Sequence, residues 1–179
     1  MYIIPNVLTL LRLFMVPLIV MLIVEQQTMG AFVLFVMAGL TDGLDGFLAK
    51  RFAWTTELGA WLDPLADKAL LVSIYVALGF YGDIPVWLVI LVVSRDLLIV
   101  GGIILSWMME NPVRMRPLLV SKINTAGQIL LAACVLADLG FQLGLGRLVV
   151  LLIWIVAAFT LLSALAYLRA WFRHMVPQQ

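Results

Sequence analysis

Four aspartates are the residues of this chain whose type and spacing could do chemistry. Asp42 and Asp45 stand three residues apart, and Asp63 and Asp67 stand four apart, in a sequence of which only 12% is charged. Either spacing puts both carboxylates on one face of a helix. Carboxylates in apolar surroundings are costly unless they are paired or bind a metal. Two such pairs on adjacent antiparallel helices could converge on one site.

The four carboxylates would form an oxygen-only ligand set, which suits Mg²⁺, Mn²⁺ or Ca²⁺ rather than zinc. Without a cation they would repel one another, and one or two divalent ions would relieve that repulsion. Two ions could also hold the attacking and leaving oxygens of a phosphoryl transfer. The sequence therefore predicts a divalent cation site for phosphate chemistry. Solvation of the carboxylates at helix ends is the structural alternative.

Small residues punctuate the same stretch of the sequence. They let another molecule, such as a nucleotide, approach the helix backbones closely. Tight packing between helices explains the glycines equally well, so both interpretations stay open for Gly43, Gly46, Ala49, Gly59 and Ala60.

The composition indicates which class of protein positions these carboxylates. Of 179 residues, 65% are hydrophobic and 12% are charged, which is typical of an all-α polytopic membrane protein. The net charge of +1 gives no indication of nucleic-acid binding. Because a helix needs ~20 apolar residues to cross a bilayer, we expect a single domain over residues 1–179 with six transmembrane helices. Their expected ranges are 6–24, 29–51, 60–81, 84–108, 118–139 and 145–171.

The basic residues predict the orientation in the membrane, because cytoplasmic connections are enriched in Lys and Arg. They place both termini and the aspartates at the cytoplasmic face of an inner (cytoplasmic) membrane. The residues concerned are Lys50, Arg51, Lys68, Arg114, Arg116, Lys122, Arg169 and Arg173.

Two further arginines interrupt apolar runs. Arg12 could extend toward the lipid headgroups or have a function of its own, and the sequence leaves both open. Arg95 precedes Asp96 in the fourth expected helix. Adjacent residues do not face each other on a helix, so we expect each of the two to find a different partner.

The aspartates and small residues together resemble the CDP-alcohol phosphotransferase (phosphatidyltransferase) family, whose pattern reads D-x2-D-G-x2-A-R-x8-G-x3-D-x3-D. The whole pattern is matched from Asp42 to Asp67, except that Lys50 stands at the family's arginine. The resemblance implies a six-helix homodimer with two divalent metal ions, Mg²⁺ or Mn²⁺, and Asp67 as the catalytic general base. It implies metal binding by Asp42, Asp45, Asp63 and Asp67, and binding of the CDP donor by Gly46, Ala49, Lys50 and Gly59.

Within the family, the chain resembles the CMP-forming cardiolipin synthases, which share S-R-D, S-K-x-N-T and L-D-P-L-A-D-K, here at residues 94–96, 121–125 and 62–68. This implies phosphatidyl transfer from CDP-diacylglycerol to phosphatidylglycerol. The alternative is a phosphatidylglycerophosphate synthase, which uses glycerol 3-phosphate and commonly has cations where this chain has Asn124 and Ile103. Fewer cations suit a phosphodiester of about one charge better than a monoester of ~1.5–2 charges.

The acceptor phosphate would then be bound by Arg95, Lys122, Arg114, Arg116 and Asn124. An alternative from another class is a divalent-cation transporter that uses the same aspartates. It would need polar residues on the far side of the membrane, where the expected helices are almost wholly apolar.

Overall fold

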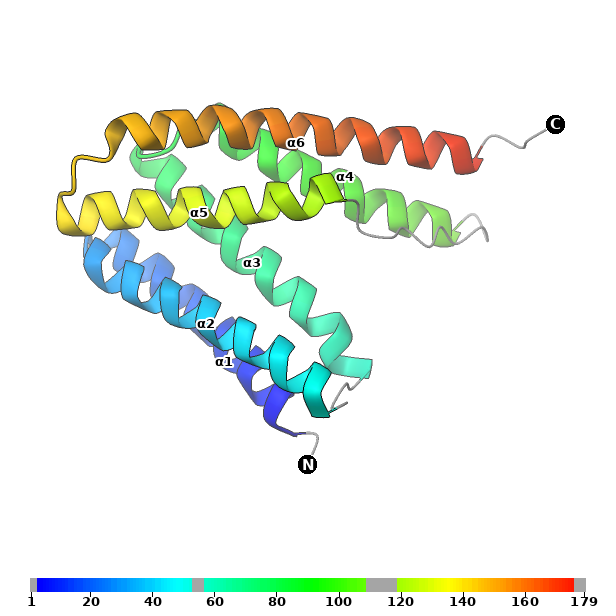
Figure 1. Ribbon diagram of the computed structural model, residues 1–179, viewed down its shortest axis with the longest axis horizontal. Helices are drawn as coiled ribbons and strands as arrows, with labels where there is room; N and C mark the ends of the chain where they lie inside the picture. Colours follow the sequence, from blue (N-terminus) through cyan, green and yellow to red (C-terminus); the bar gives the residue numbers. More distant parts are fainter. Residues whose placement is uncertain (1–2, 53–56, 109–118, 176–179) are drawn as a thin grey trace. The chain divides into compact units, whose positions relative to one another are not determined.

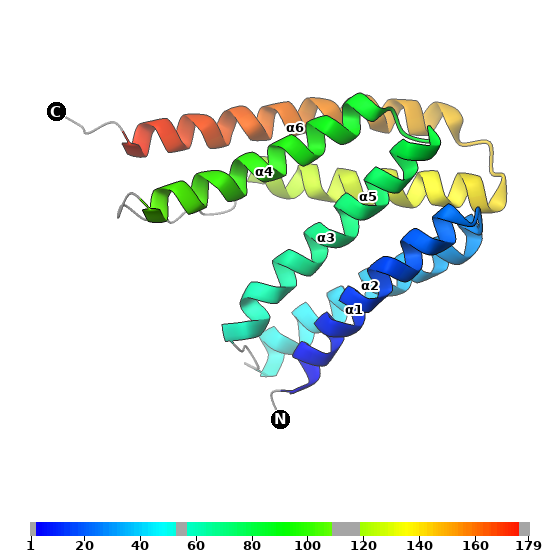
Figure 2. The ribbon, with the colours of Figure 1, turned by 180° about the vertical axis from the view of Figure 1, so that it is seen from behind.

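The computed structural model describes the backbone of residues 3–52, 57–108 and 119–175, and the side chains of residues 9–43, 66–102 and 119–171. The described residues form six α-helices and no strand (Figures 1 and 2). The all-α fold class is therefore confirmed. The helices are α1 Ile3–Val24, α2 Thr28–Phe52, α3 Glu57–Tyr81, α4 Val86–Met108, α5 Leu119–Phe141 and α6 Gly146–Met175.

Each helix covers the apolar run that predicted it, and only the ends differ. α1 begins at Ile3 rather than at residue 6, because Pro5 lies in the first turn, where its missing N–H costs no helical hydrogen bond. α6 continues to Met175, past the predicted end at residue 171.

Residues in the left-handed conformation follow three of the helices, and one of them is Gln142, directly after α5, with a φ of 54°. Gly82 follows α3 with a φ of 83°, and the amides of Gly82 and Asp83 donate to carbonyls of Gly79 and Leu78 at 3.3 and 3.0 Å. Gln26 follows α1 with a φ of 60° and closes that helix by the same pattern of bonds. This termination usually uses glycine, because a Cβ disfavours the left-handed conformation.

α1, α2, α3 and the end of α5 form the first of two compact units, from residues 1–83 and 132–146. α1 contacts both α2 and α3. It runs in the same direction as α3, because Arg12 contacts Asp67 in the first half of each helix. At the other end, the Tyr81 hydroxyl donates to the Val24 carbonyl at 3.2 Å.

The end of α5 closes the first unit against the start of α2. A Cβ added at Gly140 would lie 2.9 Å from the Cα of Met29, so only glycine allows this approach. Beside it, the rings of Phe32 and Phe141 meet edge to face with their centroids 5.6 Å apart.

α4, the first part of α5, and α6 form the second unit, from residues 84–131 and 147–179. α4 and α6 run in the same direction. Near their starts, the rings of Trp87 and Trp154 lie 5.6 Å apart, and farther along, Arg95 donates to Ser163. Parallel packing puts the C-terminal halves of both helices side by side.

α5 runs opposite to α6 in this unit. Thr160 of α6 donates to Asn124 of α5 at 2.9 Å, whereas Val156, one turn earlier on α6, lies against Gly127, which is later on α5. The second unit therefore has two parallel helices and one antiparallel helix.

Large apolar side chains lie on the outside of the helices, with Phe80 84% and Phe14 71% exposed. Such exposure is typical of a surface that meets lipid or a partner. Among the described residues, Leu119–Phe141 and Gly146–Trp171 are long and apolar enough to cross a membrane, and Thr9–Val24 and Thr28–Gly43 are shorter apolar helices.

Candidate active site

The first unit brings together aspartates from both predicted pairs. Asp42 lies on α2 and Asp67 on α3, and their side chains are 48% and 43% exposed. Asp45 and Asp63 lie on the same two helices, one turn away, but their side chains are outside the described residues. Among the described side chains, no group of three or more acidic, histidine or cysteine residues forms a metal cluster.

Arg12 of α1 is the residue that joins the two aspartates. Its Nη1 donates to Oδ1 of Asp67 at 2.6 Å, and its Nη2 lies 3.0 Å from Oδ1 of Asp42. The arginine is only 1% exposed. It therefore does not extend toward the headgroups: it places a buried positive charge between two half-exposed carboxylates and links three helices.

The residues predicted to bind the CDP donor lie on the helices of this unit. Gly46, Ala49 and Lys50 follow Asp42 on α2, and Gly59 precedes Asp67 on α3. Gly46 and Ala49 lie four and seven residues after Asp42, on the same helix face by register. The side chains of Ala49 and Lys50, and the surroundings of all four residues, are outside the described part of the chain.

The second unit contains a buried polar group around Arg95, which is 3% exposed. Its Nε and Nη2 donate to the Ser163 hydroxyl at 3.1 and 2.7 Å, and Nη2 also donates to the Ser121 hydroxyl. The guanidinium lies 5.8 Å from the ring centroid of Tyr167. Arg95 thus joins α4 to both α5 and α6.

The expectation that Arg95 and Asp96 find different partners is wrong. Nη1 of Arg95 donates to Oδ1 of Asp96 at 2.6 Å. Neighbouring Cβ atoms do diverge on a helix, but the long arginine side chain is flexible enough to fold back to the adjacent carboxylate. Asp96 therefore balances the charge of Arg95 locally.

On α5, Asn124 stands three residues after Ser121, which contacts Arg95, and is only 1% exposed. Its Oδ1 accepts the hydrogen bond from Thr160, while its Nδ2 has no hydrogen-bond partner among the described residues. Lys122 points elsewhere: it is exposed and lines a surface hollow with Ser121 and Thr125. Arg95 and Asn124 are thus both buried, Lys122 is exposed, and Arg114 and Arg116 lie outside the described residues.

Sequence reasoning missed the α6 side of this group. Thr160 and Ser163 are both fully buried and stand three apart, which puts them on one face of an apolar helix. That spacing was the available signal. Together with Arg95 and Asn124, they offer a cation, hydroxyls and an amide donor, which are groups that bind anionic oxygen.

Comparison with known proteins identifies the class of protein that carries this site. The chain belongs to the CDP-alcohol phosphatidyltransferase family, whose sequence profile matches residues 2–172. The resemblance drawn from the aspartate motif is thereby confirmed.

Individual relatives of two kinds are similar to the chain. A human cardiolipin synthase (CMP-forming) is 35% identical over 173 residues, covering 88% of this chain and 57% of that protein. A chloroplastic CDP-diacylglycerol–glycerol-3-phosphate 3-phosphatidyltransferase of rice is 33% identical over 91% of this chain and 55% of its own length. A Bacillus subtilis protein of the latter name is 28% identical and matches 93% of this chain and 94% of its own length. The chain thus spans little more than half of the first two relatives.

Proposed function

We propose that this protein is a CMP-forming cardiolipin synthase, which transfers a phosphatidyl group from CDP-diacylglycerol to phosphatidylglycerol. The composition of the buried polar group supports this choice of acceptor. Arg95 is the one buried cation among the described residues of the second unit, Asp96 balances it, and neutral Ser163 and Asn124 complete the surroundings. A phosphodiester of about one charge suits this group better than a monoester of ~1.5–2 charges.

In this proposal, the aspartates of the first unit bind two divalent ions, Mg²⁺ or Mn²⁺. The described residues fit such ions, because Asp42 and Asp67 offer oxygen ligands that are close together and half exposed. When bound, the ions supply positive charge to the donor's diphosphate and to the departing CMP. The proposed ligands are Asp42, Asp45, Asp63 and Asp67.

The remaining residues of the first unit bind the donor and move the proton. Gly46, Ala49 and Gly59 leave room for the cytidine, and Lys50 offers a positive charge to the phosphates. Asp67 accepts the proton of the terminal glycerol hydroxyl of phosphatidylglycerol. The hydroxyl oxygen bonds to the phosphorus that carries diacylglycerol, and the bond from that phosphorus to the CMP oxygen breaks, giving cardiolipin and CMP.

The acceptor is bound by the second unit in this proposal. Arg95 and the Nδ2 amide of Asn124 hold its phosphodiester. Lys122, Arg114 and Arg116 attract anionic headgroups to the membrane surface.

The same reasoning extends to location and assembly. The six helices span an inner (cytoplasmic) membrane as one domain over residues 1–179, with the aspartates toward the cytoplasm, as the distribution of Lys and Arg indicates. A homodimer follows from the family resemblance alone. Because the chain belongs to a family of transferases, we do not propose that it transports cations.

Phosphatidylglycerophosphate synthesis is the second candidate function. The Bacillus subtilis relative named for glycerol 3-phosphate is matched over nearly its whole length, which favours this alternative. The exposed Lys122 would then offer the additional positive charge that a soluble phosphate monoester needs.

The acceptor is tested with the purified protein, CDP-diacylglycerol, and Mg²⁺ or Mn²⁺. Phosphatidylglycerol and glycerol 3-phosphate are offered separately, and the lipid product is identified by mass spectrometry. We expect cardiolipin and CMP from phosphatidylglycerol, and no product when EDTA is present. Phosphatidylglycerophosphate from glycerol 3-phosphate alone would establish the second candidate.

Two matched substitutions test the aspartate site. Asp42→Asn should abolish CMP release, because it removes one proposed ligand charge. Asp83→Asn removes a carboxylate from the α3–α4 connection and should leave the rate unchanged. Equal rates for the two variants would contradict the metal assignment.

A further inference from the structure

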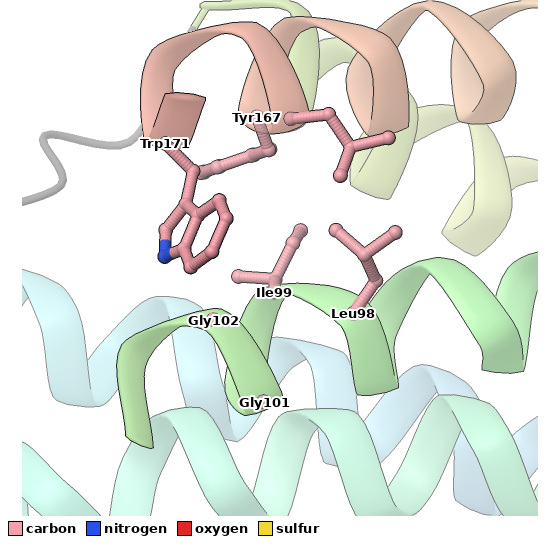
Figure 3. A pocket seen from close by; sticks show the side chains of 7 residues that line it. Leu98, Ile99, Gly101, Gly102, Tyr167 and Trp171 are labelled. Carbon is pink, nitrogen blue, oxygen red and sulfur yellow. The ribbon is translucent and has the colours of Figure 1, made fainter. Parts of the chain in front are cut away.

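The second unit contains an apolar cavity that has no role in the proposed reaction as described above. It has a volume of about 260 Å³ and lies between the C-terminal halves of α4 and α6. Leu98 and Ile99 point into it from α4, and the indole of Trp171 points into it from α6 (Figure 3). The other lining residues are Gly101, Gly102, Tyr167 and Leu168. Because the lining is almost wholly apolar, the cavity suits a hydrocarbon segment.

The ion pair of Arg95 and Asp96 lies close to one wall of the cavity, which is formed by Tyr167. Tyr167 lines the cavity, and the guanidinium of Arg95 lies 5.8 Å from the centroid of its ring. On α4, Arg95 stands one turn before Leu98 and Ile99, on the same helix face. Arg95, which also pairs with Asp96, is thus a cation close to an apolar cavity, and this combination complements an amphiphile with an anionic head and an apolar tail.

The exposed side of α4 is also apolar beside the cavity residues Leu98 and Ile99. Leu97, next to the cavity residue Leu98, is 67% exposed, and Val100 is 42% exposed. Since α6 beside it is long and apolar enough to cross a membrane, lipid is the medium from which a chain would enter.

We propose that this cavity binds one acyl chain of the acceptor lipid while Arg95 holds its phosphodiester. This inference rests on the proposed cardiolipin synthase activity and adds to it the means by which a lipid acceptor is preferred over a soluble one. Buried methylene groups then contribute to acceptor binding beyond the phosphate, and each is worth about fourfold in affinity.

The test is a pair of variants at neighbouring leucines. Leu98→Trp narrows the cavity, and Leu97→Trp makes the same change on the exposed side of α4. The rate constant kcat/KM is measured for phosphatidylglycerol with long acyl chains and with six-carbon chains. We expect Leu98→Trp to lower the preference for long chains about tenfold, which corresponds to one or two buried methylenes, relative to Leu97→Trp.

The outcomes separate the two proposals. If the unaltered protein makes no cardiolipin, the proposed function fails, and this inference fails with it. If it makes cardiolipin but both variants keep the same chain preference, only the acyl site is wrong. A rise in the KM for CDP-diacylglycerol in Leu98→Trp alone would assign the cavity to the donor and overturn the inference.

A binding measurement covers the case in which Leu98→Trp does not fold. Phosphatidylglycerol and phosphatidylcholine with the same brominated chains are compared as quenchers of Trp171 fluorescence, which is obtained as the difference between the unaltered protein and Trp171→Phe. Stronger quenching by the phosphatidylglycerol supports the site at Arg95 and Tyr167. Equal quenching by both lipids contradicts it.

Discussion

Replacing Arg12 by methionine removes the positive charge that Asp42 and Asp67 share, with little change in side-chain volume. The arginine is 1% exposed, whereas the two carboxylates are 48% and 43% exposed. Without metal, the substitution should leave two carboxylates close together without the guanidinium that contacts both. We therefore expect Arg12→Met to destabilise the metal-free protein.

The magnitude follows from the burial of the partners. Two unit charges 4 Å apart attract by ~4 kcal/mol at an effective dielectric constant of ~20, whereas fully exposed pairs contribute only ~0.2–1 kcal/mol. Arg12 is buried and its partners are half exposed, so each pair should contribute ~1–2 kcal/mol. Losing both pairs should lower the melting temperature by ~5–10 °C.

The assay is thermal unfolding in detergent with EDTA, followed by circular dichroism. Comparing Arg12→Met, Asp67→Asn and the double variant isolates the interaction, because each single variant carries its own desolvation change. We expect a coupling of ~1–2 kcal/mol between Arg12 and Asp67. Arg169→Met, which removes an exposed charge from α6, should change little and serves as the control.

Divalent metal gives a second readout of the same prediction. If the aspartates bind Mg²⁺, the ion should raise the melting temperature of Arg12→Met more than that of the unaltered protein, because it supplies the missing positive charge. A coupling near zero between Arg12 and Asp67, together with equal metal effects on both proteins, would refute the reasoning.

The remaining predictions concern helix packing and are checked by the same melting assay. On α5, Gly127→Ala should stabilise the protein by up to ~1 kcal/mol, because its Cβ would make an ordinary 3.5 Å contact with Val156 and alanine favours helix. Gly140→Ala should destabilise it by ~1–3 kcal/mol, because its Cβ would lie 2.9 Å from backbone; shifts of the same sign would contradict this contrast. Gln26→Gly should stabilise the end of α1 by ~0.5 kcal/mol, because glycine tolerates a φ of 60°, and a loss of stability would show that the side chain matters more than the backbone.

The helices could be predicted from the sequence because apolar run length depends on local composition. The ends of the helices depend on finer features: a first-turn proline such as Pro5 permits α1 to begin at Ile3, which composition alone does not favour. The left-handed Gln26 could not be predicted either, because glutamine does not signal that conformation.

The candidate site was predictable only where residue spacing reports a shared helix face. The spacing of the aspartates predicted that carboxylates of α2 and α3 could converge, and the structure brings Asp42 and Asp67 to one guanidinium. The identity of that partner depends on how α1 packs, which no spacing within α2 or α3 reports. The prediction that Arg95 and Asp96 find different partners was wrong for another reason. It rested on the directions of their Cβ atoms, whereas the long arginine side chain can still fold back to its neighbour.

Each unit has a buried arginine on its first helix that contacts two other helices of that unit. Arg12 of α1 contacts carboxylates on α2 and α3, and Arg95 of α4 contacts hydroxyls on α5 and α6. Both arginines also pair with carboxylates, but the partner of Arg95 is Asp96 of its own helix, which is only 13% exposed. The carboxylates at Arg12 are half exposed and therefore open to a metal ion, whereas Asp96 and Ser163, which contact Arg95, are far more buried. The exposure of the partners around each arginine therefore agrees with the proposed metal site in the first unit and with the proposed binding of a phosphodiester in the second.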